Sequence, residues 1–95
     1  MSLAFEWDAD KARKNLKKHG VSFEEASTVF ADPWSSTIED PLHSIEEDRF
    51  IILGESIRMR ILVVVFTERG EKLRLISARY ASRRERKQYE EGLQK

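Results

Sequence analysis

The last third of the sequence is rich in arginine, whose side chain is well suited to binding phosphate. Residues 69–95 carry nine lysines and arginines against four acids, a net charge of +5. Arg79 stands at the end of the last predicted strand and Arg83 at the start of the helix expected after it. A guanidinium group binds phosphate through two hydrogen bonds and stays charged at any working pH, and a helix N-terminus adds N–H donors. The two arginines therefore predict a phosphate pocket. The alternatives are an ion pair between Arg79 and an acid of the neighbouring strand, and a solvated position for Arg83.

Three further side chains are candidates for moving a proton near such a pocket. A histidine exchanges a proton near neutral pH, so His19 is a candidate acid or base. Lys18 competes with it as a proton carrier or phosphate contact, and Tyr80 is able to donate a proton or stack on a base. Each also has a structural alternative, because His19 would interact favourably with a helix dipole, Lys18 would be solvated and Tyr80 would pack.

The composition argues against several other kinds of site. The chain has no cysteine, and its two histidines, His19 and His43, fall in different predicted elements without a carboxylate at ligand spacing. We therefore expect no metal site, and no nucleotide cofactor either, because the four glycines are scattered rather than gathered in a phosphate-binding loop. No stretch approaches the roughly 18 apolar residues that span a bilayer, and no secretory signal opens the chain, so we expect a cytoplasmic protein without membrane contact.

Charge is distributed unevenly along the chain although its total is zero. Residues 1–21 carry a net charge of +2, residues 22–57 carry −8, and the remainder is basic. Basic elements at both ends would meet phosphate, while the acidic middle would lie elsewhere or meet a basic partner. Chance variation between solvated faces is the alternative. At 95 residues, the chain is expected to form a single domain over 1–95.

The N-terminal third is predicted to contain a short strand and two helices that position Lys18 and His19. Residues 5–7 favour a strand, Asp8 is a natural N-cap, and Gly20 ends the following helix. A capping box beginning at Ser22 starts a second helix, which Pro33 stops. On the first helix, one face at helical spacing consists of Ala12, Asn15, Leu16 and His19.

The rest of the chain is predicted to form strands followed by one helix. Strands are expected at 34–38, 49–54, 59–67 and 72–80, with a polar loop from 40 to 48. The continuous apolar run 61–66 favours a central strand covered on both faces. A second capping box, Ser82 with Glu85, opens a C-terminal helix anchored by Tyr89 and Leu93. The predicted fold class is α+β, an antiparallel meander with two N-terminal helices and one C-terminal helix.

Four segments in this order resemble the BrnT family of toxins from bacterial toxin–antitoxin pairs. They are Phe5-Glu6-Trp7-Asp8 with Lys11 and Asn15, residues 18–26, Thr67-Glu68-Arg69-Gly70, and Ile76-Ser77-Ala78-Arg79 running into residues 83–86. The resemblance implies a RelE-like fold and a metal-independent attack on RNA. It also implies a DNA-binding antitoxin, BrnA, as partner, with operator DNA bound only through that antitoxin.

Metal-free RNA cleavage uses the substrate's own 2′-hydroxyl as nucleophile and leaves a 2′,3′-cyclic phosphate. The enzyme must help remove the hydroxyl proton, donate a proton to the leaving 5′-oxygen and stabilise negative charge on phosphate. Arg79 and Arg83 are the candidates for charge stabilisation, and His19, Lys18 and Tyr80 for proton transfer. Arginines at strand ends or on strands would guide RNA along a basic groove across the sheet: Arg49, Arg58, Arg60 and Arg74. Of these, Arg58 and Arg60 are expected to share one strand face.

Two other functions are consistent with the sequence. A non-catalytic module would grip the antitoxin and contribute to operator repression, and a DNA-binding domain would need a recognition helix that the pattern does not provide. For neutralisation, an antitoxin helix would cover the arginine groove, or a basic antitoxin segment would pair with the acidic middle. Direct cover of the groove is the preferred hypothesis.

Overall fold

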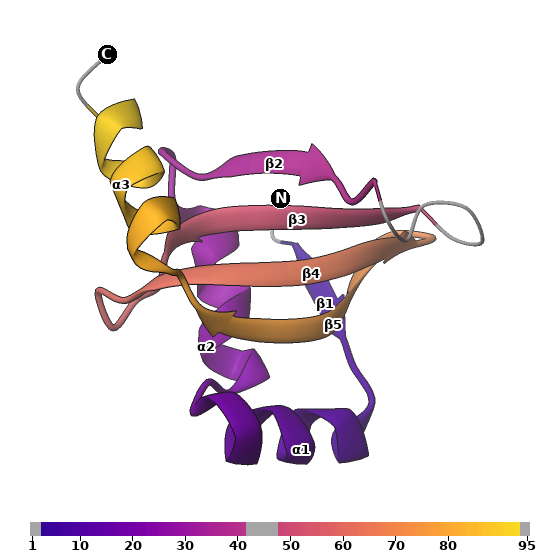
Figure 1. The fold of residues 1–95 in the computed structure, drawn as a ribbon. Coiled ribbons are helices and arrows are strands. Elements are labelled where there is room, and N and C mark those ends of the chain that lie inside the picture. Colours follow the sequence, from indigo (N-terminus) through magenta and orange to yellow (C-terminus); the bar gives the residue numbers. More distant parts are fainter. Residues whose placement is uncertain (1–2, 42–47, 94–95) are drawn as a thin grey trace.

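Five strands among the described residues, 3–41 and 48–93, form one sheet in the order β1-β5-β4-β3-β2 (Figure 1). The structure is a computed structural model. Its strands are β1 (Ala4–Glu6), β2 (Ser36–Glu39), β3 (Arg49–Glu55), β4 (Ile61–Arg69) and β5 (Lys72–Tyr80). Its helices are α1 (Ala9–His19), α2 (Phe23–Ser27), the 3-10 turn η1 (Thr28–Ala31) and α3 (Arg83–Gly92). Most of the predicted loop 40–48, including His43, lies outside the described residues.

The α+β class and the meander are confirmed, with one correction at the edge of the sheet. Strands β2 to β5 pair antiparallel in sequence order, between two N-terminal helices and one C-terminal helix. The prediction of a purely antiparallel sheet is wrong for β1, which pairs in parallel with β5 and places Phe5 opposite Leu73. A parallel neighbour needs a long crossover, which the helices and three strands between β1 and β5 provide. The three-residue pattern of β1 carries no signal of its direction.

The core lies between α1, α2 and η1 on one side and one face of the sheet on the other. Strand β4 is the central strand, as predicted from its apolar run. Its alternate residues Leu62, Val64 and Phe66 are buried against the helices. The helical side of the core consists of Val21, Phe23, Ala26 and Val29, and Ile52, Leu75 and Ala78 complete the sheet side.

Asn15 fixes α1 to β5 by taking the place of a strand. Strand β1 pairs with β5 only at Lys72–Arg74, so it does not reach Ala78. The Asn15 carboxamide accepts a hydrogen bond from the Ala78 N–H at 3.1 Å and donates to the Ala78 carbonyl at 2.8 Å. It also donates to the carbonyl of Val21 at 2.9 Å. Of the four residues predicted to share one face of this helix, Asn15 is buried, Ala12 and His19 are half-buried, and Leu16 at the margin is 51% exposed.

Helix α3 stands across the strand ends where β5 stops and β4 begins (Figure 1). Its predicted capping box is complete, since Ser82 and Glu85 bond each other's backbone N–H groups. The Tyr89 hydroxyl donates to Asp32 Oδ2 at 2.5 Å and its ring is buried, which confirms it as the anchor. The prediction of Leu93 as a second anchor is wrong, because Leu93 follows the last residue of the helix and is exposed.

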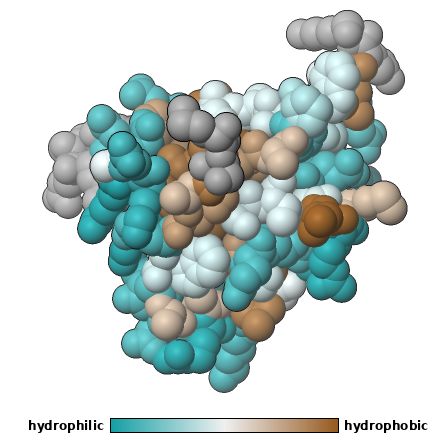
Figure 2. Space-filling view, turned by 180° about the vertical axis from the view of Figure 1, so that it is seen from behind, coloured by the Kyte–Doolittle hydropathy of each residue, from teal (hydrophilic) through white to brown (hydrophobic). Residues whose placement is uncertain are grey.

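The view from behind shows a mostly hydrophilic surface with separate apolar patches (Figure 2). One brown patch lies at the side where the hairpin between β3 and β4 projects. The hairpin carries Ile57 and Met59, each 78% exposed. None of the helices in the described part of the chain is long and apolar enough to cross a membrane.

Candidate functional site

Arg79, the favoured charge stabiliser, is tied to the start of α3. Its guanidinium donates to both carboxylate oxygens of Glu85, at 2.8 and 3.1 Å, and to the carbonyl of Tyr80 at 3.2 Å. The hydrogen bonds from Arg79 lower the pKa of Glu85 to about 2, and bonds with Ser82 add to this against the opposing effect of burial. The expected structural alternative was an acid on a neighbouring strand, whereas the observed partner lies on the following helix. Arg79 thus has the two-pronged geometry that suits phosphate, and Glu85 occupies it here.

Arg83 is the first residue of α3 and its side chain is exposed. Ser82 caps this helix, so Arg83 lies beside the N–H groups of the first turn. The structure therefore places Arg83 at a helix N-terminus as predicted, in the same first turn of α3 as Glu85, the partner of Arg79.

Tyr80 lies on the other side of the sheet from Arg79, because adjacent residues of a strand point to opposite faces. The Arg60 guanidinium lies 4.8 Å from the centre of the Tyr80 ring and donates a hydrogen bond to its hydroxyl. On the α1 side, a Cβ added at Gly20 would lie 4.0 Å from Tyr80 Cε2. The Tyr80 ring is thus placed between the end of α1 and Arg60.

Lys18 and His19 form the last turn of α1, immediately before the cap Gly20. Lys18 is exposed and His19 is half-buried. Because Gly20 abuts Tyr80, the end of α1 and the end of β5 come together in space. The five predicted catalytic residues therefore separate into two groups. Lys18, His19 and Tyr80 lie on the side of the sheet covered by α1 and α2, and Arg79 and Arg83 lie at the start of α3.

A buried carboxylate, Glu25 of α2, holds Arg60 in this arrangement. Arg60 Nε donates to Glu25 Oε2 at 2.8 Å and Nη2 donates to Oε1, while the Ser56 hydroxyl donates to Oε2 at 2.7 Å. The hydrogen bonds from Arg60 lower the pKa of Glu25 more than burial raises it. The predicted capping box at Ser22 is therefore only half formed: the Ser22 hydroxyl accepts from the Glu25 N–H at 3.1 Å, but the carboxylate is turned to Arg60.

A groove of about 660 Å³ lies between α3, the hairpin and the ends of β4 and β5. We call it the α3 groove; its lining residues are Glu55, Met59, Arg60, Ile61, Tyr80, Ala81, Arg86, Tyr89, Glu90 and Leu93. It brings two arginines and two tyrosine rings to one concave surface. Cationic and aromatic groups arranged in this way suit the phosphates and bases of single-stranded RNA.

The four predicted RNA-binding arginines do not form one continuous track. Arg49 and Arg74 lie in one row across β3, β4 and β5, on either side of Thr67, and Arg74 pairs with Glu6 at 2.8 Å. Arg58 and Arg60 lie at the opposite end of β3, roughly 20 Å away along a seven-residue strand. Apolar side chains of β3 and β4 separate the two pairs.

The prediction that Arg58 and Arg60 share one strand face is wrong, because neither residue lies on a strand. Strand β4 begins at Ile61 rather than at 59, because Met59 adopts a positive φ of 62° in the turn between β3 and β4. Arg58 is exposed in that turn and Arg60 is turned inward to Glu25.

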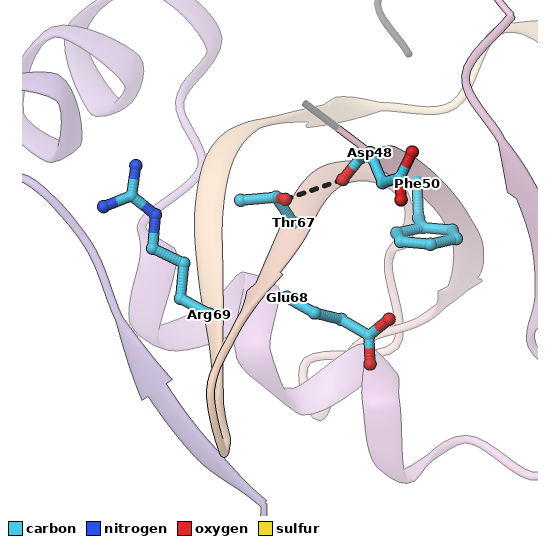
Figure 3. Close-up of a pocket in the computed structure, with 5 residues that line it drawn as sticks. All are labelled: Asp48, Phe50, Thr67, Glu68 and Arg69. Atoms are coloured by element: carbon cyan, nitrogen blue, oxygen red, sulfur yellow. Dashed lines mark hydrogen bonds between the residues drawn. The ribbon is translucent and has the colours of Figure 1, made fainter. Parts of the chain in front are cut away.

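A second hollow, of about 320 Å³, lies at the far end of β3 and β4 (Figure 3). Thr67 donates a hydrogen bond to the Asp48 carbonyl at 2.6 Å, and Arg69 points away from Phe50 and Glu68. Two carboxylates and one arginine line this hollow, so it suits phosphate less well than the α3 groove, where two arginines balance two carboxylates. Across residues 3–41 and 48–93, no cluster of three or more potential metal ligands occurs.

Comparison with known proteins identifies the family. The model of the family described as the ribonuclease toxin, BrnT, of type II toxin–antitoxin systems matches residues 7–85. The chain belongs to the BrnT family. The crystal structure of the Brucella abortus ribonuclease toxin BrnT, at 1.1 Å resolution, is 28% identical and superposes with a TM-score of 0.64. The alignment covers 86% of this chain and 100% of that one. A search of curated proteins finds no match to the chain.

Membership of the BrnT family confirms the resemblance drawn from the sequence. A ribonuclease toxin of a type II system has RNA as its class of substrate and an antitoxin as its partner. The candidate site of this BrnT protein also contains two residues that the sequence interpretation did not select, Glu25 and Arg86. Glu25 was taken only as a capping residue. Arg86 was recoverable, since it lies three residues after Arg83 on a predicted helix and these two positions are neighbours on its surface.

Proposed function

We propose that this BrnT protein is a metal-independent endoribonuclease with a RelE-like fold, neutralised by a BrnA-like, DNA-binding antitoxin. The observation that carries the proposal is the contact of Arg60 with both the ring and the hydroxyl of Tyr80 in the α3 groove. A cation beside a phenol combines phosphate binding with a proton donor. The substrate's 2′-hydroxyl supplies the nucleophile, so these groups meet the remaining needs of the reaction.

Proton transfer belongs to the helical side of the site in this proposal. The Tyr80 hydroxyl accepts a hydrogen bond from Arg60 and keeps its own O–H for donation to the leaving 5′-oxygen. His19 and Lys18, at the helix end beside Tyr80, are the candidates for taking the 2′-hydroxyl proton.

Phosphate binding belongs to the arginines around the end of β5. RNA that crosses this strand end meets Arg60 and Arg86 in the α3 groove, and Arg79 and Arg83 at the start of α3. Arg79 stabilises the developing charge when a phosphate replaces the Glu85 carboxylate on its guanidinium. Arg58 guides the chain from the hairpin side, and Arg49 with Arg74 contact RNA that extends along the sheet.

Neutralisation follows from the position of the groove. A helix of the antitoxin covers the α3 groove directly, and operator DNA is bound only through the antitoxin. If so, replacing Arg86, which lines the groove, together with Arg83 one turn before it weakens the complex. An intact complex with full RNase inhibition would exclude the groove as the contact surface.

The second candidate is a non-catalytic module that binds the antitoxin and contributes to operator repression. It is favoured by one observation, that Arg60 and Arg79 are each held by a carboxylate in this structure. The two functions differ in their effect on cells. Expression of this toxin alone arrests growth if it cleaves RNA, and Arg79→Ala restores growth while the protein accumulates to the same level. Unchanged growth on wild-type expression favours the binding module.

A further inference from the structure

Glu25 is an acid whose position and bonding are unusual for a short surface helix. Its side chain is 4% exposed, although α2 has only five residues. Both carboxylate oxygens are used: Oε1 accepts from Arg60, and Oε2 accepts from Arg60 and Ser56. A buried carboxylate is expensive to keep unless it is paired and fully bonded. Glu25 therefore fixes the position of whatever cation it binds.

Arg60 carries this constraint to the α3 groove. Its contacts with Glu25 engage Nε and Nη2, and its contact with the Tyr80 hydroxyl engages Nη1. The guanidinium is planar, so two bonds to one carboxylate set the direction of the third nitrogen. That direction is the Tyr80 oxygen, at the wall of the groove. Without Glu25, Arg60 would be free to turn toward solvent, since its side chain is already 24% exposed.

We propose that Glu25 is a positioning residue that holds Arg60 on the Tyr80 hydroxyl, so that Tyr80 serves as the acid in RNA cleavage. This inference rests on the proposed function. In the cleavage step the 2′-oxygen bonds to phosphorus as the bond to the 5′-oxygen breaks. A base takes the 2′-hydroxyl proton, and Tyr80 gives its proton to the 5′-oxygen. Arg60 stabilises the resulting phenolate, which regains a proton from water.

A purely structural pair would fix the hairpin to α2 without any effect on the reaction. The Ser56 hydroxyl that bonds to Glu25 also accepts from the Arg58 and Arg60 N–H groups, so the pair does brace the turn. The distinction therefore requires kinetics on folded protein, with a control that loses stability elsewhere. Val29→Ala provides this control, because Val29 is fully buried in η1 and lies outside the contacts of Arg60.

The test compares Glu25→Gln with Val29→Ala and wild type in cleavage of single-stranded RNA, at a temperature where circular dichroism shows all three folded. The glutamine side chain would present an amide donor to the guanidinium in place of one of the two carboxylate acceptors. We expect kcat to fall about tenfold with KM within about twofold, while Val29→Ala keeps the wild-type kcat. Equal kcat for the two variants overturns the positioning role.

A second background tests whether Glu25 acts through Tyr80. Tyr80→Phe alone is expected to lower kcat about 100-fold, and adding Glu25→Gln should lower it no further. Independent, multiplying losses contradict the proposal. If Glu25→Gln does not fold, Glu25→Asp keeps the negative charge on a side chain one methylene shorter and leaves Arg60 in place. The shorter carboxylate should no longer hold both Nε and Nη2 of Arg60, so the same tenfold loss in kcat is expected, and wild-type kcat in this variant overturns the proposal.

Failure of this inference is distinct from failure of the proposed function. A wild-type protein that cleaves no RNA refutes the function itself. Cleavage by wild type with no specific effect of Glu25→Gln leaves the ribonuclease intact and removes only the role of Glu25.

Discussion

Three arginines of this toxin are held by carboxylates, two of which come from distant parts of the chain. Arg60 pairs with Glu25, Arg74 with Glu6, and Arg79 with Glu85. Each pair leaves an oriented cation rather than a diffuse positive charge. Basic composition predicted the cations but not their partners, because 35 and 68 residues separate the first two pairs and only the folded sheet brings them together.

The first prediction separates the catalytic and structural roles of Arg79. Arg79→Ala should lower kcat/KM for RNA cleavage by about 100-fold, because charge on the phosphate loses its stabiliser. Glu85→Gln breaks the same ion pair from the other side and keeps Arg79. It should leave kcat/KM within about threefold of wild type. Equal losses in both variants mean that the pair matters only for the docking of α3.

At the scale of elements, the sheet and α1 are joined by one side chain that mimics a strand. Asn15 satisfies both backbone groups of Ala78, two residues before Tyr80. Removal of the Asn15 side chain leaves the buried N–H and carbonyl of Ala78 without a partner. This lowers the stability of the fold more than the loss of an ordinary hydrogen bond does.

The second prediction follows from this contact. Asn15→Ala should lower the free energy of unfolding by about 3 kcal/mol, measured by urea denaturation. The adjacent Leu16→Ala is the control, because Leu16 is largely exposed and its loss should cost less than about 1 kcal/mol. Similar losses for the two variants would show that Asn15 does not carry the junction between α1 and β5.

The third prediction concerns the pH dependence of α3. The pKa of Glu85 is 4.5 in its ordinary state and about 2 in the folded protein, chiefly because of Arg79. Between these values the unfolded chain binds more protons, so the free energy of unfolding rises with pH in this window and falls as acid protonates folded Glu85. Arg79 is partly solvated, which limits this contribution to about 1 kcal/mol.

The measurement is thermal unfolding of wild type and Glu85→Gln between pH 2 and 5. The variant should show a shallower rise in stability with pH across this range, and the two proteins should differ most above pH 4.5. Parallel pH profiles would show that the Glu85 carboxylate contributes nothing to folding.

Element positions were largely predictable, whereas pairing direction was not. Strand β5 occupies the predicted residues 72–80 because alternating apolar residues and turn signals bound it on both sides. Strand β4 starts two residues after its predicted start, because Met59 adopts a left-handed backbone conformation in the turn before it. No glycine in this turn indicated that conformation. The parallel pairing of β1 depends on the whole crossover, which local sequence does not encode.

At the scale of the whole molecule, the sheet divides the predicted catalytic set. Arg79 and Tyr80 are neighbours in sequence but face opposite sides of β5, and the end of α1 that carries His19 reaches Tyr80 at Gly20. The sequence placed candidates on α1, β5 and α3, and the folded chain brings these three elements to the end of β5. The sequence did not reveal that Glu25 binds Arg60, because Glu25 also fits the capping-box pattern that begins at Ser22. The pattern does not show whether its carboxylate caps the helix or pairs with an arginine.

In the proposed function, the end of β5 is the point at which RNA crosses the molecule. The α3 groove opens on one side of it and the Arg79 and Glu85 pair lies on the other. An antitoxin that covers this end would block both groups at once. The family assignment gives the class of partner, an antitoxin, and the proposed function would have it cover this one strand end.

The most direct test of this account is cleavage of single-stranded RNA by purified toxin, free of antitoxin, in excess EDTA, with analysis of the product ends. Tyr80→Phe and Arg79→Ala, purified identically, control for contaminating nucleases. We predict that wild type cleaves and leaves 2′,3′-cyclic phosphates, while both variants lose about 100-fold or more in rate. Folded wild type that leaves free and ribosome-bound RNA intact, or variants as active as wild type, would contradict a metal-independent ribonuclease centred on the end of β5.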